Sequence, residues 1–356
     1  MQYRLLGDTG VRVSTYSLGS VMFGGWGNQD ERQCIAMIRQ AMDAGINLID
    51  TADVYAEGES ERIIGEAVRG RRDEVLLATK VNGPMGKAPN ERGNSRLWIM
   101  RAVEASLRRL DTDHIDLYQL HRPDPATAIE ETLGALDDLI SQGKIRYVGT
   151  TTFPAWQLVE AQAASAQRGT ARFVCEQAPY SVLVRAAERD VLAVAERYRL
   201  GVLVWSPLAG GWLAGRYRKG QSPPEQTRAD RLTEYRPRGG RMAERYDLGN
   251  LANAAKFDAV EALAQLAASA GLSLVDLAHA FTLAHPSVTS AIIGARTPEQ
   301  LERTLAGADV RLDEATLDAI DTIVAPGSVL NPADLGWDLP WMSADARRVR
   351  PPRRLA

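Results

Sequence analysis

The chain has 356 residues, of which 45% are hydrophobic and 24% are charged, and its formal net charge at pH 7 is −3. This composition is typical of a soluble protein with ample apolar mass for a core, and so small a charge gives no reason to expect nucleic acid as a partner. No apolar run approaches the ~18–20 residues of a membrane-spanning helix, and the N-terminus lacks the features of a secretory signal. We therefore expect a cytoplasmic protein without a membrane partner.

Two short extended runs, residues 3–6 and 11–13, flank a turn with Gly and Asp and predict an N-terminal β-hairpin. Further strands are expected where nearly continuous apolar runs occur, the pattern of parallel strands that are covered on both faces. The runs are residues 16–19, 47–51, 75–80, 115–121, 147–151, 173–177, 201–206 and 290–294.

Helical patterns lie between these strands, and Gly45 and Gly143 follow two of them at the position where helices commonly end. The expected helices include residues 31–44, 60–69, 97–110, 127–141, 156–168 and 185–199. This alternation predicts an α/β fold, a (β/α)8 TIM barrel followed by a C-terminal helix and tail. The alternative is an open doubly wound sheet, but neither a G-x-G-x-x-G motif nor a P-loop follows the first strand.

We expect one barrel domain over residues 1–324 and a tail over residues 325–356, because α/β barrels of this length form single units. Residues 209–250 interrupt the alternation with many Arg, Gly and Pro residues. They are expected to form a long loop that either covers a pocket or is a surface insertion without function.

The end of the chain, from Arg347, combines prolines with like charges and is expected to be disordered rather than a site for an acidic partner. Cys34 and Cys175 fall in an expected helix and an expected buried strand. We interpret them as two unpaired, reduced thiols.

Four ionisable side chains stand at the ends of three neighbouring expected strands: Asp50, Tyr55, Lys80 and His121. Because the active sites of TIM barrels lie at the C-terminal ends of the strands, these side chains should share one mouth. Each alone has an ordinary structural explanation, such as a loop cap, a wall residue or a surface charge. Together they predict a catalytic site.

These residue types suit the reduction of a carbonyl group, whose developing alkoxide needs a proton. Tyrosine has an unperturbed pKa near 10, and a nearby ammonium group favours the phenolate and lowers that pKa. We therefore assign Tyr55 as the general acid and Lys80 with Asp50 as the pair that tunes it. A neutral His121 would donate a hydrogen bond that orients the carbonyl oxygen.

The segments that carry these residues resemble the signature blocks of the aldo-keto reductase family. The blocks are residues 47–55 with 58–61, 78–80, 106–110 and 115–124. The resemblance runs from about Tyr3 to Val324. It implies a TIM barrel closed at the bottom by the hairpin, no metal, NADPH bound without a Rossmann domain, and the same roles for the four residues above.

The resemblance also implies residues that hold the nicotinamide end of NADPH: Thr151, Thr152, Gln177, Trp205, Ser206, Pro207 and Leu208. The family usually has Ser-Asn where this chain has Thr151-Thr152, so the amide that grips the carboxamide is lost at the second position. Gln177 matches the other carboxamide ligand. Trp205 matches the aromatic residue that stacks on nicotinamide, and its ordinary alternative is a core aromatic.

Residues 293–300 resemble the loop and helix start that hold the 2′-phosphate of NADPH, with Gly294, Arg296, Thr297 and Gln300 as the expected ligands. Helix N-terminal N–H groups, a hydroxyl and a guanidinium suit an anion. The ordinary alternative is that Arg296 is a solvated loop charge and Thr297 a helix cap. Thr304 replaces the usual Asn near the adenine, so the adenine contacts stay open.

The sequence thus predicts an NADPH-dependent reductase of a small-molecule aldehyde or ketone. One alternative is an NADPH-binding regulatory subunit with slow turnover, because the hairpin and the 205–208 block also resemble potassium-channel β subunits of this family. Another is a sugar-nucleotide ketoreductase, which residues 93–95 and 153–156 faintly resemble. The substrate and the oligomeric state stay open, and the expected pocket walls are Met22, Trp26, Met85, Tyr180 and residues 209–250.

Overall fold

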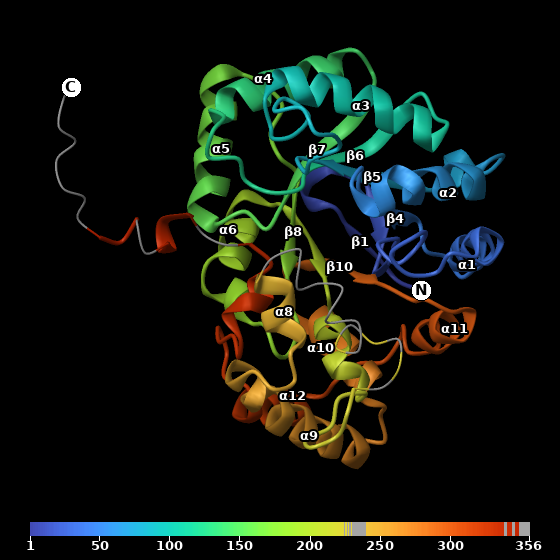
Figure 1. The fold of residues 1–356 in the computed structure, drawn as a ribbon, viewed down its shortest axis with the longest axis vertical. Coiled ribbons are helices and arrows are strands. Elements are labelled where there is room, and N and C mark those ends of the chain that lie inside the picture. Colours follow the sequence, from blue (N-terminus) through green and yellow to red (C-terminus); the bar gives the residue numbers. More distant parts are fainter. Residues whose placement is uncertain are drawn as a thin grey trace.

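The computed structural model describes residues 1–223, 225, 227, 229, 240–337, 340–343 and 346–348. Its centre is a closed barrel of parallel strands in the order β10-β3-β4-β5-β6-β7-β8-β9, with helices around it (Figure 1). Pairing of β10 with β3, in which Ala291 lies opposite Tyr16, closes the ring. The predicted TIM barrel is confirmed, and the open sheet is excluded.

The barrel strands are β3 Tyr16–Gly19, β4 Leu48–Asp50, β5 Leu76–Val81, β6 Ile115–Leu120, β7 Ile145–Thr151, β8 Cys175–Pro179, β9 Gly201–Trp205 and β10 Val288–Ile293. The helices are α1 Glu31–Asp43, α2 Glu59–Val68, α3 Arg96–Leu110, α4 Ile129–Ser141, α5 Ala155–Arg168, α6 Val191–Tyr198, α8 Gly240–Tyr246, α9 Ala254–Ser269, α10 Leu274–Ala284, α11 Pro298–Ala306 and α12 Glu314–Ile323.

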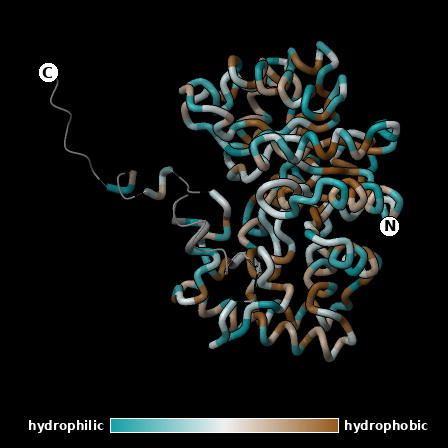
Figure 2. Tube along the Cα trace, turned by 45° about the vertical axis from the view of Figure 1, so that its right-hand side comes forward, coloured by the Kyte–Doolittle hydropathy of each residue, from teal (hydrophilic) through white to brown (hydrophobic). Residues whose placement is uncertain are grey.

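Local signals set the helix ends. The Asp30 side chain accepts a hydrogen bond from the backbone N–H of Gln33 and caps α1. Gly45 (φ 91°) and Gly143 (φ 72°) follow α1 and α4 in the left-handed conformation that glycine adopts without strain. Figure 2 shows hydrophobic and hydrophilic residues alternating along the outer helices, as expected for helices that lay one face on the barrel.

The helix expected over residues 185–199 was wrong as one element. A 3-10 turn, Ala186–Arg189, precedes α6, and the backbone leaves the helical region at Asp190 (φ −152°). The Glu188 carboxylate explains the break, because it accepts hydrogen bonds from Arg185 Nε at 2.9 Å and from the backbone N–H of Gly327 at 2.8 Å. The turn is therefore held by a hydrogen bond to Gly327, a residue 139 positions further along the chain.

The predicted hairpin, β1 Tyr3–Leu5 with β2 Arg12–Ser14, is confirmed and closes the bottom of the barrel. Leu6 and Val13 are buried among the interior side chains of the strands. At Gly7 (φ 56°), an added Cβ would lie 2.5 Å from the Arg199 carbonyl oxygen, so the close approach of the hairpin to the barrel requires glycine. The hairpin therefore covers the N-terminal end of the barrel strands.

Residues 209–250, expected as a long loop, contain the 3-10 segment Ala209–Ala214 and α8. Trp212 and Tyr246 are fully buried and Tyr217 is almost so. Trp212 packs against Tyr217 and Phe257 with ring centroids 5.0 and 5.1 Å apart. The described part of this stretch is thus packed on the barrel, while residues 230–239, including Tyr235, lie outside the described residues.

The chain after α12 returns to the barrel, and we call its residues 325–337 the C-terminal segment. The backbone N–H of Arg185 donates to the Ser328 carbonyl at 2.7 Å, and Val329 forms a bridge with Val184. Of the basic end of the chain, residues 349–356 lie outside the described residues.

Both cysteines are free and buried, as expected. Among the described residues no single helix is long and apolar enough to cross a membrane, and the pair Leu251–Ser269 and Leu274–Ala284, bent by 94°, reaches that length only when both are taken together.

Candidate active site

The candidate site follows from the alternation of side chains along the barrel strands, in which every second residue lies on the same face. Five interior residues form an apolar layer above the hairpin: Leu48, Ala78, Leu117, Cys175 and Leu203. Two residues further along each strand, on the same face, the side chains become polar or aromatic. These upper positions are Asp50, Lys80, Gln119, Gln177 and Trp205. The barrel therefore carries a polar layer at its mouth, built on the apolar one.

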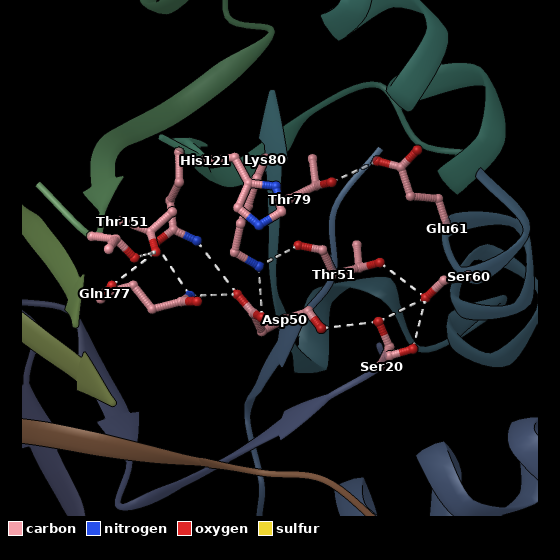
Figure 3. Close-up of polar contacts among 12 residues, drawn as sticks. Ser20, Asp50, Thr51, Ser60, Glu61, Thr79, Lys80, His121, Thr151 and Gln177 are labelled. Atoms are coloured by element: carbon pink, nitrogen blue, oxygen red, sulfur yellow. Dashed lines mark hydrogen bonds and ion pairs between the residues drawn. The ribbon is translucent and has the colours of Figure 1, made fainter. Parts of the chain in front are cut away.

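Lys80 and Asp50 form a buried ion pair at the centre of this layer (Figure 3). Lys80 Nζ lies 2.7 Å from Asp50 Oδ2 and donates to the Thr51 carbonyl at 2.6 Å. Burial acts to lower the pKa of Lys80, but the charges of Asp50 and Tyr55 outweigh it, and the pKa is raised. Lys80 is thus a fixed ammonium group inside the barrel.

Tyr55 and His121 lie beside that ammonium group. Lys80 Nζ is 5.2 Å from the centroid of the Tyr55 ring, and the rings of Tyr55 and His121 are 5.8 Å apart in an edge-on arrangement. The structure therefore brings together the four residues that the sequence placed at one mouth.

The direction of the pKa shift agrees with the expectation from the sequence for His121 but not for Tyr55. Burial raises the pKa of the Tyr55 phenol, and the Lys80 ammonium opposes that rise without reversing it. The lowered pKa that the sequence predicts for Tyr55 is therefore not found in the structure. Burial, with Arg122 and Lys80, lowers the pKa of His121 well below its ordinary value, so this imidazole is neutral at pH 7.

Two amides bind the carboxylate of Asp50 from across the barrel. Gln177 Nε2 donates to Asp50 Oδ1 at 2.7 Å, and Gln119 Nε2 approaches the same oxygen at 3.4 Å. Sequence reasoning missed Gln119. Its signal was the period of two along the strand, because it lies on the same face as Leu117 and opposite Lys80 in the register of β5 and β6.

Thr151 and Thr152 form a tight corner at the end of β7. Thr152 adopts the left-handed conformation (φ 62°), and both its backbone N–H and the Thr151 hydroxyl donate to the Gln177 carbonyl. The fully buried Glu176 supports the corner from outside the barrel wall, since it accepts hydrogen bonds from the Thr150 hydroxyl and the Phe153 N–H. Burial raises the pKa of Glu176 to about 7.

Trp205 ends β9 and is half-buried, and Ser206 follows it in the left-handed conformation (φ 57°). Pro207 and Leu208 continue this turn, with Pro207 buried. The Arg245 guanidinium lies 5.7 Å from the Trp205 ring. The turn over residues 205–208 therefore lies against α8 at the C-terminal end of the barrel strands.

The C-terminal segment covers the edge of Trp205 and is fixed by buried charges. An added Cβ at Gly336 would lie 2.6 Å from the Trp205 ring, so the two are in close contact. Asp334 accepts a hydrogen bond from Arg245 Nε at 3.1 Å and forms an ion pair with the fully buried Lys256 of α9. No local sequence pattern indicates these contacts, because the partners lie about 80–90 residues apart.

The expected phosphate ligands lie together at the end of β10 and the start of α11. The Thr297 side chain accepts a hydrogen bond from the backbone N–H of Gln300, and Gln300 Oε1 accepts one from the N–H of Arg296. Asn28 Nδ2 donates to the Arg296 carbonyl at 2.9 Å. Gly294 is exposed, with open space around it. Thr297 is thus a helix cap, as the ordinary alternative has it, within a loop that is held from both sides.

Of the expected pocket walls, Trp26 lies beside Tyr55, with ring centroids 6.1 Å apart. Met22 and Met85 are partly buried. Tyr180 is a core residue instead, so its expected place in the wall was wrong. Its hydroxyl donates to Glu188 at 2.7 Å, and its ring packs on Phe281 of α10.

A second buried acidic group lies between the barrel wall and α2. Glu61 accepts a hydrogen bond from the Thr79 hydroxyl and pairs with Arg109, each at 2.6 Å. Neither carboxylate oxygen of the buried Asp53 has a hydrogen-bond partner in the described part of the chain. Burial, with the charge of Glu61, raises the pKa of Asp53 to about 8, so this carboxyl is mostly protonated at pH 7.

The closed parallel barrel with a polar layer at its mouth defines a class, that of TIM-barrel proteins whose site lies at the C-terminal ends of the strands. The Aldo/keto reductase family model matches residues 16–325, nearly the whole chain. This protein therefore belongs to the aldo/keto reductase family.

Curated relatives agree with that membership. The chain is 37% identical over 348 residues to "Uncharacterized oxidoreductase YrpG" of Bacillus subtilis, covering 95% of this chain and 100% of the relative. It is 37% identical to "Aldo-keto reductase YhdN" of the same species, covering 85% of this chain and 87% of the relative. It is also 36% identical to "Probable voltage-gated potassium channel subunit beta" of Oryza sativa, covering 91% of this chain and 97% of the relative.

Proposed function

We propose that this chain reduces an aldehyde or ketone to an alcohol with NADPH as the hydride donor and Tyr55 as the proton donor. The observation that carries the proposal is the buried Lys80–Asp50 pair directly beside Tyr55 and a neutral His121. A buried ion pair contributes little net stability, so its place beside a phenol favours a role in proton transfer.

The residues act in a definite order in this proposal. Neutral His121 donates a hydrogen bond to the carbonyl oxygen and orients it. Because burial raises the pKa of Tyr55, its phenol holds the proton at pH 7 until negative charge develops on that oxygen. Lys80 then stabilises the phenolate that remains, and Asp50 keeps the ammonium group in place.

The residues fit a nicotinamide dinucleotide, which supplies the hydride when bound. Thr152 and Ser206 both hold the strained left-handed conformation at the ends of β7 and β9, on either side of β8, a feature that concentrates at ligand sites. The N-terminus of α11 and Arg296, beside the open space at Gly294, suit a phosphate. Thr297 and Gln300 hold this loop, because the Thr297 hydroxyl accepts from the Gln300 N–H and Gln300 Oε1 accepts from the Arg296 N–H.

The experiment that tests this function follows NADPH oxidation with a panel of simple aldehydes and ketones. Turnover that depends on Tyr55 supports the proposal. NADPH binding without turnover of any carbonyl compound would contradict it.

A regulatory subunit with slow turnover is the second candidate. The observation that favours it is the likeness to the potassium-channel β subunits, 36% identical in rice and 35% identical in Arabidopsis thaliana. The same aldehyde panel separates the candidates, because a regulatory subunit would bind NADPH tightly and oxidise it only slowly with every substrate.

A further inference from the structure

An arginine that the proposed chemistry does not use lies at the same mouth. Arg122 follows His121 directly, and its guanidinium is half-buried and donates to the His121 carbonyl. Because the His121 ring lies 5.8 Å from the Tyr55 ring, this contact places Arg122 next to one of the two side chains that would contact a substrate carbonyl, and its charge acts on the pKa of both.

No carboxylate among the described residues forms an ion pair with this guanidinium, although the charge of Glu176 acts on its pKa. Among the described residues, none lies within ion-pair distance of Arg122, whereas Arg72, Arg109 and Arg185 all form such pairs. The nearby acid, Glu176, already accepts hydrogen bonds at both of its oxygens. A partly buried guanidinium without a counterion is unusual, because removing a charge from water costs free energy that an ion pair offsets.

Two further arginines affect Arg122 electrostatically. Arg245 of α8 lies at this mouth, 5.7 Å from the Trp205 ring, and after burial the charges of Arg245 and Arg241 act to lower the pKa of Arg122. Arg245 is balanced by Asp334, and Arg241 donates to the carbonyls of Pro332 and Ala333. The positive charge next to the reacting position is therefore that of Arg122, which pairs with no carboxylate among the described residues.

We infer that the substrate is a carbonyl compound that also bears an anionic group, most simply a carboxylate, and that Arg122 binds this group beside the reacting carbonyl. This inference rests on the proposed carbonyl reduction and names its substrate class. The planar guanidinium matches a carboxylate through paired N–H···O bonds, and the balance of charge would be restored only when the substrate is bound.

The test compares 4-carboxybenzaldehyde with methyl 4-formylbenzoate, which differ in charge at the same position. Wild type should reduce the acid with the higher kcat/KM. Arg122→Met should lower kcat/KM for the acid by about ten- to a hundredfold and change that for the ester by less than about threefold. Arg122→Lys keeps the charge but loses the planar guanidinium, so its kcat/KM for the acid should lie between those of wild type and Arg122→Met. If Arg122→Met does not fold, Arg122→Lys replaces it in the comparison.

A matched control is Arg199→Met, which removes an exposed arginine near the bottom of the barrel, where it pairs with Asp8. It should leave the acid-to-ester ratio unchanged. Equal kcat/KM for the two aldehydes in wild type would overturn the inference, as would an equal loss with both in Arg122→Met. A weaker NADPH affinity in Arg122→Met with an unchanged ratio would assign Arg122 to the cofactor phosphates and would also overturn it.

Failure of the proposed function gives a different result. If wild type reduces neither aldehyde, tryptophan fluorescence measures the binding of both compounds instead. Tighter binding of the acid that is lost in Arg122→Met would keep the anion site while rejecting the reaction, and equal binding would reject both.

Discussion

The two sides of the barrel mouth are held in different ways. On the side of β4, β5 and β6, Asp50 and Lys80 are fixed by contacts with neighbouring strands. On the side of β9, Trp205 meets α8 and the C-terminal segment, which come from outside the barrel. The proposed proton-transfer group is thus a property of the barrel itself, whereas the proposed cofactor side depends on segments that are added to it.

This contrast predicts that changes on the first side alter the chemical step and that changes on the second alter cofactor affinity or stability. The largest expected effect is that of Tyr55→Phe. Removal of the proton donor should lower turnover by about 10²–10⁴-fold and leave NADPH affinity nearly unchanged, because the ring still fills its place. Steady-state rates and an NADPH titration measure both quantities.

Tyr118→Phe is the matched control for that variant. The Tyr118 hydroxyl is buried without a hydrogen-bond partner in the described part of the chain, so its loss should not lower activity. A Tyr55→Phe enzyme that keeps more than about a third of wild-type turnover would contradict the assignment, provided that proton transfer limits the rate.

The next effect concerns the buried charges that fix the C-terminal segment. Asp334→Asn should lower the free energy of unfolding by about 3–5 kcal/mol, because it leaves Lys256 and Arg245 without their carboxylate. It should also weaken NADPH binding more than it slows the chemical step. Urea denaturation and cofactor titration check the two parts.

An exposed pair offers the control. Asp258→Asn removes the partner of Lys219 on the surface and should change stability by less than about 1 kcal/mol. Similar losses in the two variants would show that the C-terminal segment is not specially dependent on its buried charges.

Arg296→Ala should have a smaller effect, confined to the phosphate end. Loss of a charge-assisted contact, about 1.5–3 kcal/mol, should weaken NADPH binding by roughly ten- to a hundredfold and leave NADH binding almost unchanged. Arg303→Ala, at an exposed position of α11, is the control. Equal affinities of wild type for the two cofactors would contradict the role of this loop.

The smallest expected effect concerns the buried Asp53 beside the barrel wall. It is a change in how the free energy of unfolding depends on pH. The pKa of Asp53 is raised to about 8 in the folded chain, above the ordinary value of 3.8. The unfolded chain therefore releases this proton first, and stability falls as pH rises between these values. Asp53→Asn should remove that fall, so that its stability relative to wild type increases from pH 5 to pH 7 by up to roughly 2–3 kcal/mol. Chemical denaturation at the two pH values measures the difference, and a constant difference would contradict the prediction.

The side of the mouth that carries the proposed proton-transfer group was predictable from the sequence, and the proposed cofactor side was less so, for a physical reason. Asp50, Lys80 and His121 end apolar strands, and a parallel barrel places all such ends together. The contact of Gly336 with Trp205 and the pair of Lys256 with Asp334 join segments that no local pattern relates. Local patterns therefore located the strand ends but not the segments that pack over them.

The hydrogen bond from Gln177 to Asp50 spans 127 residues of sequence and joins opposite walls of the ring. A piece of the chain that ends before β8 would contain Asp50, Tyr55, Lys80 and His121 but would lack the amide that completes their setting. Two fragments divided in the β7–β8 connection could recover turnover only by associating into a whole ring. Fragment complementation would thus make catalysis itself a reporter of barrel closure.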